Sequence, residues 1–183
     1  GFPTGFSIPY GTNRTWVTDV DGDGAMEVVG YTNNSYTPSI NSRAVFVVGW
    51  DDARPAGTQL HVRWVTQVSD ITADTHTWVD ESAMDLDGDG IVEVTSTFTE
   101  GGVATTHVRD GRDGTVRASI PGELQGIVQL SEAGPPTLLV QDGLDLNGYR
   151  FSDFSAVPPP AFTLPASSLL DRFDRGAYAQ QSL

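Results

Sequence analysis

The sequence predicts an all-β protein that is built from about three similar units. The chain of 183 residues contains 20 glycines and 11 prolines, which supply turns, and its many threonine and valine residues suit pleated sheets. An acidic stretch that leads directly into an apolar strand occurs twice, as "DVDGDGAMEVV" and "DLDGDGIVEV". Long helical patterns are nearly absent. Together these observations favour one turn-rich β domain with a real core.

The two acidic stretches lie inside longer matching segments. "RTWVTDVDGDGAMEVV" and "HTWVDESAMDLDGDGIVEV" share a Thr-Trp-Val triplet before the acids and an apolar strand after them. Downstream, "VFVVGWDDARPAGTQLHVRW" and "TTHVRDGRDGTVRASI" both have the pattern of a β-hairpin with a glycine-containing turn. We therefore predict one unit over residues 12–68 and a second over residues 74–120.

A third unit, without acids at the ligand positions, is predicted over residues 124–156. It reads "GIVQLSEAGPPTLLVQDGLDLNGYRFSDF", and it aligns when Gly134 is matched to Gly90. The positions of the acids are then taken by Gln129, Ser131, Ala133 and Thr137. The stretch "DGLDLNGYRF" is expected to match the hairpin "DGRDGTVRAS" of the second unit. This unit is therefore predicted to keep the strands and to lose the acidic loop.

Residues 157–183 are predicted to be a proline-rich linker and a C-terminal tail that follow the repeats of residues 1–156. The tail opens with "VPPPAF", and a proline run cannot lie in a central strand. Ser167 or Ser168 is placed to cap a short helix. We expect this tail to be irregular or to contain one short helix.

The length of the repeat indicates the architecture. A unit of roughly 40 to 45 residues with several short strands has the size of one β-propeller blade. An antiparallel sandwich with two similar loops is the alternative. Since propellers have about four to eight blades, three blades make a partial propeller, or one that other chains complete.

Composition excludes several classes of function. The formal net charge of −14 argues against nucleic acid and anionic membranes as partners, because both require a basic surface. The absence of cysteine excludes disulfides, zinc–thiolate sites and thiol nucleophiles. No apolar run is long enough to predict a membrane span. The start at Gly1 suggests a processed N-terminus, which fits an extracellular, cell-surface or periplasmic location.

The acidic stretches have the pattern of a site for a hard cation. Acids at alternate positions of a tight loop direct their oxygens at one centre, as Ca²⁺ requires. Positions one, three, five, seven and nine are the predicted ligands, with the backbone carbonyl used at position seven: Asp19, Asp21, Asp23, Ala25 and Glu27 in the first loop, and Asp85, Asp87, Asp89, Ile91 and Glu93 in the second. An EF-hand is disfavoured because position twelve is Gly30 or Ser96 instead of glutamate, and because a strand follows each loop.

These two D-x-D-G-D-G-x-x-E loops, at blade-sized spacing, resemble the FG-GAP/VCBS repeats of integrin-α-like β-propellers. The resemblance extends from about Thr15 to Phe154. It implies two structural Ca²⁺ sites at the positions given above. It also implies a non-catalytic extracellular module that mediates contact between protein chains. The alternative is a carbohydrate-binding or accessory part of a secreted polysaccharide-degrading enzyme.

No residue is predicted to be catalytic, so a non-enzymatic role is favoured. His61, His76 and His107 belong to no triad or metal-binding motif. Among the aromatic residues, Tyr36 and Trp50 lie in the enlarged loops of the first unit, and they are the predicted contacts for a ligand such as a glycan.

Overall fold

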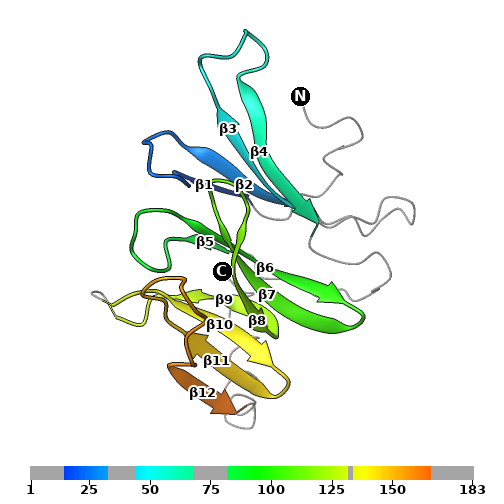
Figure 1. Ribbon diagram of the computed structural model, residues 1–183, viewed down its shortest axis with the longest axis vertical. Coiled ribbons are helices and arrows are strands. Elements are labelled where there is room, and N and C mark those ends of the chain that lie inside the picture. The colour runs from blue at the N-terminus through cyan, green and yellow to red at the C-terminus, as the bar shows by residue number, and fades with distance from the viewer. Residues whose placement is uncertain (1–14, 33–43, 68–81, 132–133, 166–183) are drawn as a thin grey trace, which may run out of the picture.

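A computed structural model describes residues 15–32, 44–67, 82–131 and 134–165. Within these ranges the protein consists of three four-stranded antiparallel sheets and contains no helix, which confirms the all-β prediction. The sheets follow one another from top to bottom in Figure 1. No helix among these residues has the length and apolar character needed to cross a membrane. Tyr36, His76 and the predicted helix after Ser167 lie outside the described residues.

Each sheet is an up-and-down meander in which strands that follow one another in sequence are neighbours. The first sheet contains β1 (Thr15–Thr18), β2 (Glu27–Thr32), β3 (Ala44–Trp50) and β4 (Leu60–Gln67). The second contains β5 (Ser82–Met84), β6 (Glu93–Glu100), β7 (Val103–Asp110) and β8 (Val116–Pro121). The third contains β9 (Glu123–Val128), β10 (Thr137–Asp142), β11 (Asp145–Tyr149) and β12 (Phe162–Pro165).

Apolar side chains hold the sheets together in two separate cores. Core 1 joins the first sheet to the second and consists of Val20, Val29, Tyr31, Val45, Val47, Trp64, Val92 and Val94. Core 2 joins the second sheet to the third and consists of Leu86, Val108, Ala118, Ile120, Leu124, Leu138, Val140, Tyr149 and Phe151. Alternate residues of a strand point to opposite faces, so the second sheet contributes to both cores from its two faces.

The fourth strand of the first two sheets contains a β-bulge at the same place. In the first sheet Val47 pairs with Trp64 and Val48 pairs with Val62, so Arg63 is the extra residue. In the second sheet Val108 pairs with Ala118 and Arg109 pairs with Val116, so Arg117 is the extra residue. A bulge redirects the side chain of its extra residue. No register shift interrupts the pairing of β11 with β12 in the third sheet.

The third sheet differs from the sequence prediction in two respects. Strand β12 lies in the segment predicted to be linker and tail, and it pairs with β11. The proline rule excludes only a central strand, whereas β12 is an edge strand. The predicted hairpin match was also wrong. The Asp142–Asp145 turn joins the second and third strands of its sheet, whereas the turn after Asp110 joins the third and fourth.

Candidate functional site

The acidic loops connect β1 to β2 and β5 to β6, and their glycines give both loops the same shape. Gly24 and Gly90 have φ angles of 88° and 86°, in the left-handed region that residues with a side chain rarely adopt. This conformation turns backbone N–H groups toward the first aspartate. The N–H of Gly24 donates to Oδ2 of Asp19 at 2.8 Å, and the N–H of Gly90 donates to Oδ2 of Asp85 at 3.0 Å. Backbone N–H groups of the first loop, with Gly24 as the largest cause, hold the pKa of Asp19 below its usual value.

Three of the predicted carboxylates gather in each loop. In the first loop the ligand atoms of Asp19, Asp21 and Glu27 lie within 4.8 Å of one another. The second loop brings Asp85, Asp87 and Glu93 together in the same way. These six residues occupy positions one, three and nine, which were predicted from the spacing.

The residues at positions five and seven are arranged differently. Asp23 and Asp89 each use Oδ1 to accept the backbone N–H two residues further on, at 2.7 and 2.8 Å. The other oxygen, Oδ2, of each aspartate faces an arginine that is described below. Participation of the carbonyls of Ala25 and Ile91 stays a prediction.

The glutamate of each loop is withdrawn from water. Glu27 and Glu93 are both 0% exposed, at the start of β2 and β6. Each accepts a hydrogen bond at Oε2 from the second residue of its own loop, at 3.0 Å from Val20 and at 2.8 Å from Leu86. Burial is the largest cause of a raised pKa in both carboxyls, and it brings the pKa of Glu93 to about 7.

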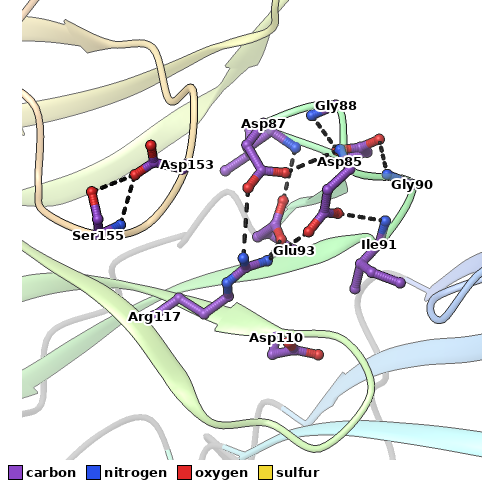
Figure 2. A network of polar contacts seen from close by, with 12 residues as sticks. Asp85, Asp87, Gly88, Gly90, Ile91, Glu93, Asp110, Arg117, Asp153 and Ser155 are labelled. Atoms are coloured by element: carbon purple, nitrogen blue, oxygen red, sulfur yellow. Dashed lines mark hydrogen bonds and ion pairs between the residues drawn. The ribbon is translucent and has the colours of Figure 1, made fainter.

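An arginine from the fourth strand points into each loop, and sequence analysis did not identify it. Arg117 places Nη1 at 2.6 Å from Oε1 of Glu93, and it lies 3.6 Å from carboxylate oxygens of Asp87 and Asp89. Figure 2 shows its guanidinium reaching from β8 to the acids of the loop. Arg63 pairs in the same way, with Nη2 at 2.9 Å from Oε1 of Glu27.

Further contacts hold both arginines in place. Arg63 bonds the Asp21 carboxylate and lies 3.7 Å from Asp23. Its side chain passes over Gly49, where a Cβ would lie 2.5 Å from Nε. Arg117 lies over the ring of Phe154, at 4.2 Å from the centroid. The signal that could have revealed both arginines is a Val-Arg pair after a Gly-Thr turn, in "GTQLHVR" and in "GTVR".

The third loop has other side chains at the ligand positions. Gln129, at position one, donates through Nε2 to the carbonyl oxygens of Ser131 and Gly134. Thr137 takes the place of the buried glutamate and accepts a 3.0 Å hydrogen bond from Nε of Arg150. The Gln129 amide therefore joins two backbone carbonyls of its own loop at the position where the other two loops have an aspartate.

The two acidic loops are linked by a series of hydrogen bonds that crosses core 1. The indole N–H of Trp64 donates to the carbonyl of Gly111 at 2.8 Å, and the N–H of Gly111 donates to the carbonyl of Val92 at 3.0 Å. The N–H of Val92 in turn donates to the carbonyl of Val20, inside the first loop, at 3.2 Å. The third loop has Pro136 at the position of Val92, and proline has no N–H to donate.

Trp50 is the only one of the two predicted ligand-contact residues that lies in the described ranges. It ends β3 and is 53% exposed. Its indole N–H donates to Asp52 at 2.7 Å, which fixes the ring on the surface. Trp50 therefore offers an exposed aromatic ring at the end of the first sheet where β2 begins.

The raised pKa of Glu93 gives the cation-free protein a specific pH dependence. Its folded pKa of about 7 exceeds the ordinary pKa of 4.5 for a glutamate, so stability from this carboxyl is present below pH 4.5 and is lost as pH rises through 7. In EDTA, we expect the unfolding free energy of the wild type to fall by about 2 to 3 kcal/mol relative to Glu93→Gln between pH 5 and 8. Urea denaturation at several pH values measures this difference. Glu123→Gln is the control, and parallel profiles of wild type and Glu93→Gln would contradict the assignment.

Comparisons with known proteins relate the fold to one group of enzymes. No family model matches the chain, and no curated protein matches it either. Among solved structures, rhamnogalacturonan lyase YesW is similar over 85% of this chain, with 19% identity and a TM-score of 0.63. The exotype rhamnogalacturonan lyase YesX is similar over 85%, with 13% identity and a TM-score of 0.57.

This similarity concerns the fold. The chain covers 34% of YesW and 33% of YesX, so it spans about a third of the length of either lyase. Neither structure is named as an FG-GAP or VCBS protein, and that resemblance stays a prediction. The three sheets described here therefore have the arrangement found in part of two larger polysaccharide lyases.

Proposed function

We propose that this chain is a calcium-stabilised segment of a β-propeller that belongs to a polysaccharide-binding or polysaccharide-degrading protein. Each four-stranded meander is one blade, and the sheets stack through their faces as blades do. The observation that carries the proposal is the repeated cluster of three carboxylates, one of which belongs to a fully buried glutamate. The fold similarity to rhamnogalacturonan lyases supports the carbohydrate context.

The chemistry of the two clusters fits Ca²⁺. Both clusters consist of carboxylate oxygens, which hard cations prefer, and neither contains histidine or cysteine. Oε1 of Glu27 is buried and, within the described part of the chain, accepts no hydrogen bond of good geometry, and the positive charge next to it is Nη2 of Arg63 at 2.9 Å. Such an oxygen is costly unless a cation compensates it. Asp19, Asp21 and Glu27 would hold one ion, and the matching residues of the second loop would hold another.

The proposed role of Ca²⁺ is structural. The ion would tie each acidic turn to the first residue of the following strand, and so fix the loops that contact each other across core 1. Sites built from a few acids in an exposed loop suit the millimolar Ca²⁺ found outside cells. We therefore also propose an extracellular, cell-surface or periplasmic location.

Calcium is expected to stabilise the folded chain. At 100 times its Kd, a ligand of the native state adds about 2.7 kcal/mol per site, which corresponds to a rise in Tm of roughly 5 to 10 °C for a chain of this size. Differential scanning calorimetry in CaCl₂ and in EDTA measures the shift. The Asp21→Asn/Asp87→Asn double variant should lose most of it, and MgCl₂ should produce a smaller one. The same Tm for the wild type in CaCl₂ and EDTA would refute the metal assignment.

The carbohydrate context predicts a role for Trp50. We expect the chain to bind oligosaccharides prepared from rhamnogalacturonan, with the exposed ring of Trp50 stacking on a sugar face. Trp50→Ala should weaken this binding about tenfold, which corresponds to about 1.4 kcal/mol. Isothermal titration calorimetry provides the measurement. The matched control is Leu60→Ala, because Leu60 pairs with Trp50 across the strands and is equally exposed but not aromatic. Equal affinities for both variants would exclude Trp50 from the site.

Contact with another protein chain is the second candidate function, and the outer face of the third sheet favours it. Val20 and Leu86, at position two of the first two loops, are fully buried in cores 1 and 2. Leu130 has the same position in the third loop and is 53% exposed. On the sheet face that points away from core 2, Leu164 is 40% exposed. Since the inner faces of this protein pack sheet against sheet, the occupant that we propose is a further four-stranded sheet.

In a solution of the isolated chain, a second copy can supply that sheet. We expect self-association at concentrations of about 10 to 100 μM, measured by size-exclusion chromatography with light scattering. Leu130→Asp/Leu164→Asp should be monomeric, because both charges would be buried in the contact. Leu144→Asp is the control, since Leu144 lies in a turn and is 78% exposed. A wild type that stays monomeric at 100 μM would contradict this candidate.

A further inference from the structure

We propose that Arg63 and Arg117 are internal counter-cations that compete with Ca²⁺ for the acidic loops. Each guanidinium neutralises part of its loop in the cation-free protein and is displaced when the ion binds. The arginines thereby set the affinity of the loops for calcium. This inference rests on the proposed calcium sites and assigns to two residues a function that the acids alone do not have.

The contacts show that arginine and ion require the same oxygens. Oε2 of Glu93 accepts the N–H of Leu86, so Oε1 is the oxygen left for a cation, and Nη1 of Arg117 lies 2.6 Å from it. Arg117 also faces Asp87, another member of the carboxylate cluster. A doubly charged ion and a guanidinium at the same few oxygens repel each other strongly. Binding of the ion therefore requires the arginine to move away.

The position of the arginines is built into both sheets. Arg63 and Arg117 are the extra residues of the two β-bulges, and a bulge is a means of redirecting one side chain. Both side chains are mostly buried, with exposed fractions of 17% and 21%. A surface ion pair formed by chance would show neither the repeated bulge nor this burial.

The third sheet provides an internal comparison. Its loop has no acid at the ligand positions, its fourth strand, β12, contains no arginine, and no register shift interrupts that strand's pairing with β11. A bulged arginine on the fourth strand accompanies the acids in the first two sheets and is absent from the fourth strand of the third sheet, whose register shift lies between β9 and β10. In the third sheet Arg150, which follows β11, bonds Thr137 instead of an acid. This correlation is expected if the arginine serves the acidic loop, and it is not expected if the arginine serves the sheet.

Displacement of Arg117 would also affect the contact between the second and third sheets. Its guanidinium lies over the ring of Phe154, which stacks on Phe151 of core 2 with centroids 4.6 Å apart. Arg63 has no recorded ring contact of this kind among the described residues. Occupation of the second loop is thus coupled to the side-chain packing of the next sheet, whereas occupation of the first is coupled to core 1.

Calorimetric titration with CaCl₂ tests the competition. We expect Arg63→Gln and Arg117→Gln each to raise the Ca²⁺ affinity of one site at least tenfold, because the competing charge is removed. Arg63→Lys and Arg117→Lys keep the charge and should show smaller increases. Arg54→Gln is the matched control, since Arg54 pairs with Asp51 outside the loops and is 44% exposed. It removes one positive charge and should leave the affinity within about twofold of the wild type.

A second readout uses thermal unfolding. In EDTA both glutamine variants should have a lower Tm than the wild type, because the acids lose their counter-ion, and saturating CaCl₂ should remove most of that difference. Unchanged or weaker binding by the glutamine variants, while the wild type binds, would overturn the inference and leave the calcium sites intact; the arginines would then only position the acids. Absence of binding in the wild type and all variants would overturn the calcium sites themselves.

Discussion

The complete burial of one glutamate carboxylate per acidic loop is the constraint on which the rest of the structure depends. Glu27 and Glu93 lie at the boundary between a loop and a central strand, where water does not reach them. A buried carboxylate needs hydrogen bonds and a positive charge close by, because desolvation alone costs several kcal/mol. The backbone N–H of the second loop residue donates the hydrogen bond, and the arginine of the bulge supplies the positive charge. The glycine pair, the loop conformation and the bulge are all parts of the same compensation.

The same loops also determine how neighbouring sheets meet. The residue between the first two aspartates points away from the acids and into a core, as Val20 and Leu86 do. The residue before each buried strand has a comparable role, because Val92 joins core 1 and donates to the first loop. One short segment therefore carries a charged side and an apolar side. Because both sides belong to the same segment, we expect a change in the charge of a loop to alter the packing of one sheet against the next.

The acidic loops could be predicted from the sequence because their carboxylates and glycines lie within nine residues of one another. The arginines could not be assigned in this way. Arg63 lies 42 residues from Asp21, and the Val-Arg pair that both fourth strands share marks a repeated position without indicating that its side chain meets the acids. The strand β12 was missed because the proline run before it was assigned to a linker, although an edge strand can follow such a run. The hairpin of the third unit was misaligned because both candidate turns contain Asp-Gly, and turn residues identify a turn without indicating which strands it joins.

The β-bulges have a consequence for how such repeats can diverge. The hairpin between β3 and β4 is longer than the one between β7 and β8, yet both arginines arrive at the same oxygens. The position of each arginine side chain is therefore set by the register of the fourth strand, and it does not depend on the length of the preceding hairpin. Insertions at the hairpin tips are therefore neutral with respect to the loop chemistry. A deletion of one residue at the bulge would restore regular pairing and turn the arginine away from the acids. Selection on these units is expected to act on the register of the last strand and to leave the tips free to vary.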